Sequence, residues 1–342
     1  MRRIGITGGA VFIGTNAALH FLALGDQVTI FDNLSRPGSG ENLLEIRRRY
    51  PSVIFQLGDI RDAAAVAILV GAQDVIIHLA AQVAVTTSVT NPMDDFSINA
   101  FGTMTLLDEI RKSKRTPIVI YSSTNKVYGS LSKIPVIETD TRYAFADREA
   151  IDESAPLDFH SPYGCSKGTA DQYAIDFYRI YNIPTVVFRQ SCVYGPHQFG
   201  VEDQGWVAWF MIASMLNRPL TIYGNGKQVR DLLYIDDLIE AYDMAIGNID
   251  ATKGNVFNIG GGPKNTLSVW AEFQPLLASL VGHTVAANHG HFRQGDQPIF
   301  IAETGKFELA TGWKARVDVQ DGIRQVHEFL RAHQDRLLTA FR

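Results

Sequence analysis

Short apolar runs alternate with amphipathic stretches over the first two-thirds of the chain. The apolar runs predict strands at 4–6, 27–31, 53–57, 74–79, 117–122 and 184–189. The stretches between them predict helices over 14–24, 40–50, 63–70, 98–111 and 163–181. Strands that are buried on both faces and joined by helices form a parallel, doubly wound sheet. The pattern therefore predicts an α/β protein.

Two other regions break this rhythm. The segment 129–160 is polar and rich in acids, and we expect a long loop over the site. After Val193 the pattern turns irregular, which predicts a smaller lobe that closes over a ligand. We therefore expect one domain from 1–190, to which 231–258 returns, and a C-terminal lobe from 191–230 and 259–342.

Composition narrows the class of protein. With 342 residues, 46% of them apolar and 20% charged, the chain is typical of soluble globular proteins. A net charge of −5 gives no reason to expect nucleic acid as a partner. Cys165 and Cys192 are the only cysteines, so neither disulfides nor a zinc site is expected. The run at 206–216 is too short to span a bilayer, and we expect a cytoplasmic protein without a membrane partner or a metal.

A glycine-rich loop joins the first predicted strand to the first helix. It reads Thr7-Gly8-Gly9-Ala10-Val11-Phe12-Ile13-Gly14, and such glycines let the backbone approach a pyrophosphate at a helix N-terminus. Asp32 ends the second strand near the ~20-residue offset of a ribose-binding carboxylate. A carboxylate there repels a 2′-phosphate, so the pattern favours NAD on a Rossmann-type sheet. Arg36 lies nearby and leaves NADP open.

A second motif indicates redox chemistry on an alcohol. The Tyr163-x-x-x-Lys167 spacing places both side chains on one helix face. Lys167 would lower the pKa of the Tyr163 hydroxyl and make it an acid or base near neutral pH. Thr124, at a strand end, could bond the same substrate oxygen. By itself the spacing is also compatible with an incidental Tyr and Lys on a surface helix.

Taken in order, these motifs resemble the extended short-chain dehydrogenases/reductases of the nucleotide-sugar epimerase and dehydratase group. The resemblance covers nearly the whole chain. Besides the motifs above, it is carried by 32–35, 58–61, 78–81, 99–103, 122–129, 194–196, 224–226, 230–231 and 258–261. It implies a homodimer or homotetramer whose interface is formed by the helices at 98–111 and 163–181.

The resemblance also implies site residues. Those expected to bind NAD are Gly8, Phe12, Ile13, Gly14, Asp32, Asn33, Ser35, Arg36, Asp59, Ile60, Leu79, Ala80, Ala81, Gln82, Asn99, Ser122, Tyr163 and Lys167. Those expected to bind the substrate are Thr86, Thr124, Asn125, Gln190, Gln204, Trp206, Arg230 and Arg293. Asp59 could instead cap the helix from Ala63, Trp206 could be core, and Arg230 and Arg293 could form surface salt bridges.

Within the group the chain is most similar to the CDP-paratose 2-epimerases, through 82–88, 122–129, 157–168 and 203–207. This implies conversion of CDP-paratose to CDP-tyvelose, in O-antigen synthesis, by transient oxidation to a 2-keto sugar and hydride return on the opposite face. Thr124, Tyr163 and Lys167 would be catalytic. Dehydratases of the group carry Asp-Glu where this chain has Asn125-Lys126, so elimination of water is disfavoured.

Three alternatives stay open. The substrate could be another nucleotide sugar, such as a GDP- or UDP-hexose, epimerised at C2 or C4. The protein could be an oxidoreductase that releases its cofactor. It could also be a non-catalytic NAD-binding protein, because Val11 stands where the family has glycine. A β-branched residue dislikes positive φ, so Val11 has either an ordinary backbone, a weakened cofactor site or lost catalysis.

Overall fold

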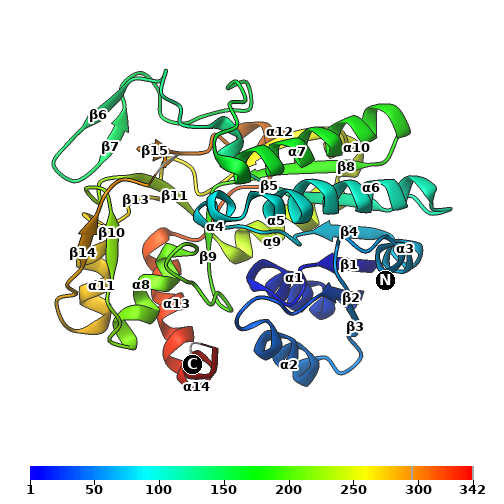
Figure 1. Ribbon diagram of the computed structural model, residues 1–342, viewed down its shortest axis with the longest axis horizontal. Helices are drawn as coiled ribbons and strands as arrows, with labels where there is room; N and C mark the ends of the chain where they lie inside the picture. Colours follow the sequence, from blue (N-terminus) through cyan, green and yellow to red (C-terminus); the bar gives the residue numbers. More distant parts are fainter. Residues whose placement is uncertain (294–295, 341–342) are drawn as a thin grey trace.

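A parallel sheet forms the centre of the larger domain. The computed structural model describes residues 1–293 and 296–340. Within them the sheet has the strand order β12-β8-β5-β4-β1-β2-β3 (Figure 1). Its strands are β1 (Arg3–Thr7), β2 (Gln27–Asp32), β3 (Ile54–Leu57), β4 (Val75–His78), β5 (Ile118–Thr124), β8 (Thr185–Gln190) and β12 (Asn255–Ile259). All pairings are parallel, which confirms the predicted Rossmann-type α/β fold.

Helices cover both faces of this sheet (Figure 1). One face carries α3 (Ala63–Ala72), α6 (Gly102–Lys112) and α7 (Ser161–Tyr181), and the other α1 (Phe12–Ala23), α2 (Ser39–Arg49) and α9 (Ile235–Gly247). Side chains alternate between the two cores: Ile76 of β4 packs toward α3 and α6, and its neighbour Ile77 packs toward α1. This double burial explains why the strands are almost continuously apolar.

Shorter elements complete the larger domain. They are α4 (Val85–Thr90), α5 (Pro92–Phe96), the π-helix η1 (Ser97–Phe101), the 3₁₀-helix η2 (Asn125–Tyr128), α10 (Ile249–Thr252) and α12 (Gly305–Thr311). The predicted helix over 98–111 is thus divided, because its first turn is the π-helix and α6 follows.

The smaller lobe is built from later segments. Its strands are β9 (Cys192–Tyr194), β10 (Thr221–Tyr223), β11 (Val229–Tyr234), β13 (Thr266–Ser268), β14 (Asn288–Gly290) and β15 (Ile299–Phe300). Its helices are α8 (Trp206–Met215), α11 (Phe273–Val281), α13 (Val319–Ala332) and α14 (Gln334–Ala340). The proposed domain boundaries stay predictions, and 294–295 and 341–342 lie outside the described residues. None of the described helices has the length and apolar character needed to cross a bilayer.

The segment 129–160 differs from the expected loop over the site. It contains a hairpin of β6 (Val136–Glu138) and β7 (Tyr143–Phe145). Phe145 and Ile151 pack with Phe300 of β15, and the Ile151 N–H donates to the Ile301 carbonyl at 2.8 Å. None of the segment lines the cavities described below. The polar composition misled the prediction because a few apolar side chains are enough to hold the hairpin against the lobe.

A buried ion pair ties α7 to the centre of the sheet. The Arg189 guanidinium donates to both Asp171 carboxylate oxygens, at 3.0 and 2.9 Å, and both side chains are almost fully buried. The Ser123 hydroxyl of β5 donates to the same carboxylate at 2.7 Å. Arg189 also donates to the Tyr128 hydroxyl of η2 at 3.1 Å. One carboxylate therefore aligns β5, β8 and α7.

We expect an Asp171→Ala substitution to lower the free energy of unfolding by about 3–5 kcal/mol, because it leaves the buried Arg189 charge uncompensated. Chemical denaturation of the variant measures this loss. The matched control is Asp176→Ala at an exposed position of the same helix. If both variants lose less than about 1 kcal/mol, the range of surface pairs, the ion pair does not organise the sheet.

Candidate active site

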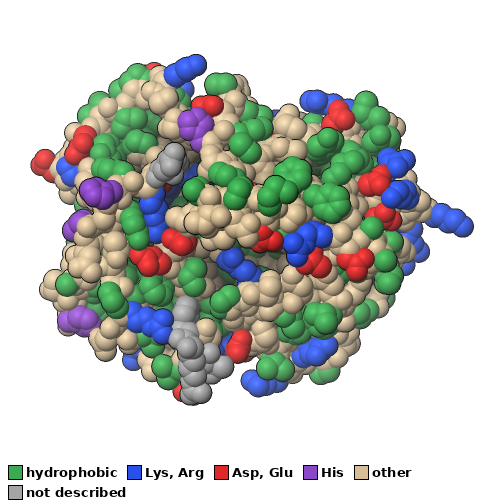
Figure 2. Space-filling model, in the orientation of Figure 1, with side chains coloured by type: hydrophobic (Ala, Val, Ile, Leu, Met, Phe, Trp, Pro, Cys, Tyr) green, Lys and Arg blue, Asp and Glu red, His purple; other side chains and the backbone are tan. Residues whose placement is uncertain are grey.

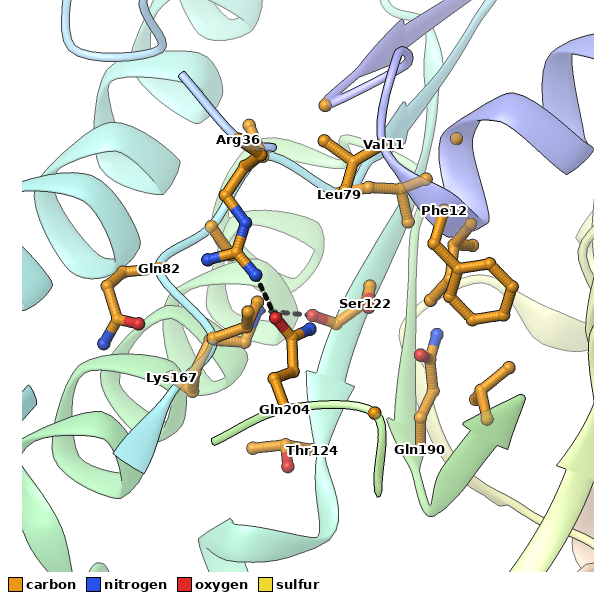
Figure 3. Close-up of a pocket in the computed structure, with 18 of the residues that line it drawn as sticks. Val11, Phe12, Arg36, Leu79, Gln82, Ser122, Thr124, Lys167, Gln190 and Gln204 are labelled. Carbon is orange, nitrogen blue, oxygen red and sulfur yellow. Dashed lines mark hydrogen bonds between the residues drawn. The ribbon is translucent and has the colours of Figure 1, made fainter. Parts of the chain in front are cut away.

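A cavity of about 570 Å³ opens at the carboxyl ends of the central strands. Figure 2 shows the hollow on this face of the molecule, and Figure 3 shows side chains from several elements converging in it. It lies where the strand order reverses between β1 and β4, the usual ligand site of a doubly wound sheet. The expected residues that line it are Gly8, Phe12, Ile13, Gly14, Asp32, Asn33, Ser35, Arg36, Asp59, Ile60, Leu79, Ala80, Ala81, Gln82, Ser122, Thr124, Asn125, Tyr163, Lys167, Gln190, Gln204, Trp206 and Arg230.

Two glycines make the first loop possible. Gly8 has φ +68°, and a Cβ added there would lie 2.9 Å from the Ala80 backbone nitrogen. A Cβ on Gly14 would lie 2.3 Å from the Gly8 carbonyl oxygen. The bare backbone leaves a cradle at the N-terminus of α1, where backbone N–H groups and the helix dipole attract a phosphate. The loop therefore fits the pyrophosphate of a dinucleotide.

Val11 occupies this loop without strain. Its φ of −95° and ψ of 176° are extended, so a β-branched residue is tolerated. Its N–H donates to the Gly8 carbonyl at 3.3 Å, and its carbonyl accepts from the Thr15 N–H at 2.8 Å. Its side chain lines the cavity (Figure 3). Of the three possibilities for Val11, the structure supports the ordinary backbone.

Asp32 places a carboxylate at the end of β2. It accepts hydrogen bonds from the backbone N–H groups of Ala10, at 3.0 Å, and Leu34, at 2.8 Å. Burial raises its pKa, and these hydrogen bonds act in the opposite direction. Arg36 extends from the neighbouring loop across the cavity and donates to the Gln204 side chain (Figure 3). Both groups lie where the adenosine half of a dinucleotide would bind next to the glycine loop.

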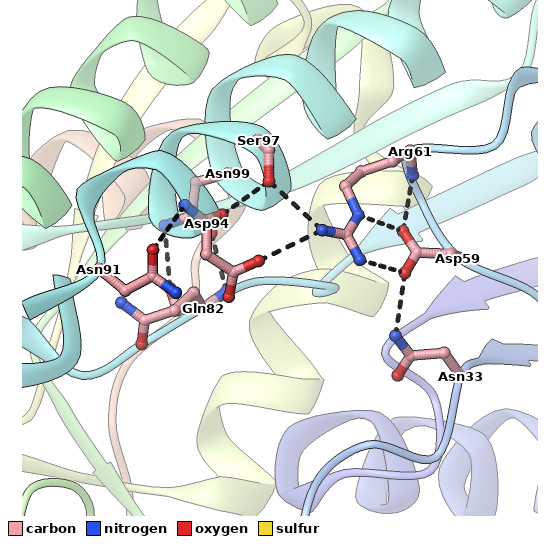
Figure 4. A network of polar contacts seen from close by, with 8 residues as sticks. All are labelled: Asn33, Asp59, Arg61, Gln82, Asn91, Asp94, Ser97 and Asn99. Carbon is pink, nitrogen blue, oxygen red and sulfur yellow. Dashed lines mark hydrogen bonds and ion pairs between the residues drawn. The ribbon is translucent and has the colours of Figure 1, made fainter.

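Asp59 belongs to a polar network at the rim of the same cavity (Figure 4). The Arg61 guanidinium donates to both its carboxylate oxygens at 2.8 Å and holds its pKa at about 2. Arg61 also pairs with Asp94 at 3.3 Å, and Asn33 donates to Asp59 at 3.2 Å. The N-cap of α3 is Asp62, so the alternative of Asp59 as a helix cap is wrong.

Asn99 does not line the cavity, contrary to its expected contact with the cofactor. It is almost fully buried and exchanges two hydrogen bonds with the Gln82 backbone, each 2.9 Å. It also donates to Asp95 and Ser166, each at 3.1 Å. Asn99 therefore holds the wall segment that contains Gln82 in position (Figure 4).

Thr124, Tyr163 and Lys167 converge at the far end of the cavity. Thr124 ends β5, and the other two lie one turn apart on α7. All three are almost fully buried. The Lys167 ammonium donates to the Ser122 carbonyl and lies 4.4 Å from the centre of the Tyr121 ring. The predicted trio is therefore assembled in one wall.

The pKa of Tyr163 differs from the expectation. Burial raises it to about 12, against a smaller opposing effect of a hydrogen bond with Thr124. Burial also lowers the pKa of Lys167 to about 7, although Asp171 and Asp95 act against this shift. Lys167 is not among the causes of this shift, and its ammonium donates to the Ser122 carbonyl, so the lowering of the Tyr163 pKa by Lys167 stays a prediction. Burial therefore favours the neutral form of the Tyr163 phenol, and additional positive charge in the cavity would lower its pKa.

A second cavity, of about 430 Å³, adjoins the first. The two share wall residues that include Lys126, Gln204, Trp206 and Arg230, and the second also contains the expected Thr86 and Arg293. Arg230 is buried and pairs with Asp296 at 2.5 Å. Arg293 pairs with Asp203 at 2.9 Å and lies over the Tyr223 ring at 3.9 Å. Both arginines form salt bridges, as the alternative interpretation expected, but these salt bridges lie in the wall of the cavity and not on the outer surface of the protein.

Among the described residues that line this second cavity, some buried polar atoms have no hydrogen-bond partner. They include the Thr86 hydroxyl and the Gln228 side-chain carbonyl. A buried polar group costs free energy unless it is hydrogen-bonded. The arginines of this cavity carry positive charge, so its wall suits a ligand with negative charge.

Lys126, Cys192 and Asp203 are wall residues that were not predicted from the sequence. Cys192 lines the first cavity and also packs against the hydrophobic core, and burial raises the pKa of its thiol. Lys126 lies two residues after Thr124, the end of β5, and this short distance in sequence could have indicated that it lies near the site. Asp203 lies in the segment 203–207 that carries the family resemblance, but nothing in that segment indicated a role for its carboxylate.

Comparison with known proteins agrees with this geometry. Residues 4–260 match the NAD dependent epimerase/dehydratase family. The CDP-paratose 2-epimerase of Salmonella typhi is 44% identical over 95% of this chain and 98% of its own. A putative UDP-glucose 4-epimerase of Methanocaldococcus jannaschii is 31% identical over 95% of this chain and 97% of its own.

Solved structures share the whole architecture. UDP-glucose 4-epimerase of Thermotoga maritima, solved with UDP-glucose, has a TM-score of 0.82 and 29% identity over 97% of this chain and 99% of its own. The dTDP-glucose 4,6-dehydratase DesIV of Streptomyces venezuelae, solved with NAD, has a TM-score of 0.83 and 27% identity over 97% of this chain and 98% of its own.

We expect an Asp32→Asn substitution to weaken NAD⁺ binding about 10- to 100-fold, because it removes a charge-assisted hydrogen bond to the ribose. Binding of NADP⁺ should weaken less or improve, because the carboxylate no longer repels the 2′-phosphate. Titration calorimetry with both dinucleotides measures the two changes, with the exposed Asp250→Asn as control. An unchanged ratio of the two affinities would show that Asp32 does not face the ribose.

Proposed function

The chain belongs to the NAD dependent epimerase/dehydratase family and is an NAD-dependent nucleotide-sugar epimerase, and from that premise we propose that it converts CDP-paratose to CDP-tyvelose. The observation that carries the proposal is the pair of residues after Thr124. Asn125 and Lys126 line the cavity there and contribute an amide and an ammonium. Neither can supply the carboxylic acid and carboxylate that elimination of water requires.

The residues of the first cavity fit NAD. The Gly8 cradle would hold the pyrophosphate, Asp32 the adenosine ribose, and the rim at Asp59 and Ile60 the adenine. Lys167 would hold the nicotinamide ribose. Bound NAD⁺ would supply a reversible hydride acceptor for the sugar carbon and the positive charge of its oxidised ring.

The protein side chains handle the proton and the oxygen. The C2 hydrogen of the sugar is not acidic, so direct deprotonation is implausible and oxidation must come first. We assign Tyr163 as the base that takes the proton of the C2 hydroxyl, and Thr124 as the group that orients this oxygen. The 2-keto sugar then presents its other face. On hydride return Tyr163 gives the proton back, and its neutral form is already favoured by burial.

The second cavity would bind the nucleotide diphosphate. We assign the diphosphate to Arg230 and Arg293, because a guanidinium matches phosphate geometry. Thr86, Gln204 and Trp206 would shape the base and sugar pocket. Asn125 and Gln190, which face the first cavity, would bond sugar hydroxyls.

A second candidate keeps this mechanism and changes the substrate. Similarity to UDP-glucose 4-epimerases supports epimerisation of a UDP-hexose at C4, and a GDP-hexose is a further variant. A non-catalytic role has lost its main motivation, because the backbone of Val11 is ordinary. The cytoplasmic location and the role in O-antigen synthesis stay predictions.

We also propose that the protein is a homodimer or a homotetramer. Large apolar side chains are exposed along η1 and α7, including Phe101, Tyr173, Ile180 and Tyr181. Several large apolar side chains exposed on neighbouring helices are typical of an interface. The same two helical segments are those that the family resemblance assigns to the dimer contact.

The substrate is tested by proton NMR of the purified protein with CDP-paratose in D₂O, without added cofactor. We expect CDP-tyvelose without deuterium at C2, because the same hydride leaves and returns. Deuterium at C2 would show that this hydrogen leaves as a proton that exchanges with the solvent, and would contradict the return of the same hydride. If no conversion occurs even after NAD⁺ is added, a panel of UDP- and GDP-sugars becomes the next test and the assignment to CDP-paratose fails.

The catalytic role of Tyr163 is tested by Tyr163→Phe, which we expect to lower kcat by about 10²–10⁴-fold, the usual contribution of a positioned acid–base group. The NAD⁺ affinity should change little. The control is Tyr173→Phe on the exposed face of the same helix. Equal activity of the two variants would favour the non-catalytic role.

The assembly is tested by Tyr173→Glu, which we expect to convert the dimer or tetramer to a smaller species, because it places a charge in the apolar contact. Light scattering after size-exclusion chromatography gives the mass. Leu309→Glu, at an exposed leucine of α12, is the control. A monomeric wild-type protein would contradict the proposed assembly.

A further inference from the structure

Lys126 lies at the junction of the two cavities and lines both. It belongs to η2, the short helix directly after β5. Its backbone N–H donates to the Thr124 hydroxyl oxygen at 3.2 Å. The backbone of Lys126 is thus held beside Thr124, a group that the proposed mechanism uses on the substrate oxygen.

The charge around Lys126 is not balanced. Its ammonium donates to the Gln297 side chain at 3.2 Å and lies 3.8 Å from an Asp296 carboxylate oxygen. That same oxygen is the partner of Arg230 at 2.5 Å. Two cations therefore share one carboxylate in the described wall, and Arg293 adds to the field at Asp296.

This arrangement suits an anion. Burial lowers the pKa of Lys126, and the nearby Arg230 charge lowers it further. Both effects reflect the free-energy cost of holding a second cation in a largely buried position. An anion that enters between the two side chains would remove this cost, and a phosphate group offers several oxygens to bond both.

The position of the reacting carbon indicates which phosphate of the substrate would lie between Lys126 and Arg230. This step rests on the proposed C2 epimerisation. In a nucleotide sugar, C1 carries the phosphate and C2 is bonded to C1, whereas C4 lies across the ring. When C2 faces Thr124 and Tyr163, the phosphate attached to the sugar must lie close to these hydroxyls. When C4 faces them, the ring separates the two.

We propose that Lys126 binds the sugar-linked β-phosphate of the substrate and so places C2, rather than C4, at the catalytic hydroxyls. Arg230 binds the same diphosphate from the other side. With the phosphate held at two points, the 2-keto sugar turns about its bonds to that phosphate without leaving the cavity. Lys126 is in this account a residue that selects the site of reaction.

The test compares nucleotides with and without the β-phosphate. Affinities for CDP and CMP are measured by titration calorimetry on the NAD-loaded protein, for wild type, Lys126→Met and Lys133→Met. Lys133 is an exposed lysine that lines neither cavity. We expect Lys126→Met to weaken CDP binding about tenfold or more and CMP binding less than about twofold, since a charge-assisted hydrogen bond is lost only with the β-phosphate. Lys133→Met should change neither.

Kinetics provide a second readout. With CDP-paratose, Lys126→Met should lower kcat/KM by at least the factor lost in CDP affinity, and Lys126→Arg should recover part of it. An equal loss for CDP and CMP, or no loss for either, overturns the proposal. So does a loss of kcat with unchanged CDP affinity, because Lys126 would then act on the sugar.

The two proposals fail in different ways. If wild type neither binds CDP nor converts CDP-paratose, the assigned substrate is wrong. The same comparison is then made with the nucleoside diphosphate and monophosphate that wild type does bind. If Lys126→Met still weakens only the diphosphate, the role of Lys126 in β-phosphate binding stands. If it weakens neither or both, that role is wrong.

Discussion

The buried pair of Arg189 and Asp171 is the constraint on which the site depends. Asp171 lies on α7 one turn after Lys167, and Arg189 lies on β8 beside β5. Ser123 of β5 joins the pair directly before Thr124. The helix with Tyr163 and Lys167 is therefore locked to the strand with Thr124. A buried charge pair adds direction to apolar packing, because its hydrogen bonds are satisfied in one alignment.

The two adjoining cavities form one binding region whose two ends carry different charged groups. Near the glycine loop the backbone donors and the Asp32 carboxylate suit a pyrophosphate and a ribose. Toward the lobe the walls carry Lys126, Arg230 and Arg293, with Asp203 and Asp296 as counter-ions. A neutral phenol stands between these ends. The end toward the lobe therefore suits a ligand that has a diphosphate and an oxidisable alcohol. The end near the glycine loop suits a dinucleotide.

The sequence predicted what has a local cause. Buried strands are apolar wherever they occur, and Gly8, Gly14 and Asp32 act through the backbone near them, so the sheet and the cofactor loop were foreseeable. Three features were not, because they depend on distant residues. Phe145 and Ile151 hold the hairpin of 129–160 against β15, Asn99 bonds the Gln82 backbone behind the wall, and the pKa of Tyr163 follows from burial. Arg230 was predicted as a site residue, but the sequence could not show that Arg230 and Lys126 share the Asp296 carboxylate, because the three residues are far apart in the chain.

The central claim is that one hydrogen leaves C2 and returns to the same carbon of the same molecule. The most direct measurement mixes two samples of CDP-paratose. One carries deuterium at C2, and the other carries no deuterium but a ¹³C label elsewhere in the sugar. The product is analysed by mass spectrometry. The account predicts that deuterium stays at C2 and that molecules with both labels do not form. Loss of deuterium to water, or its transfer to the ¹³C-labelled product, would contradict it.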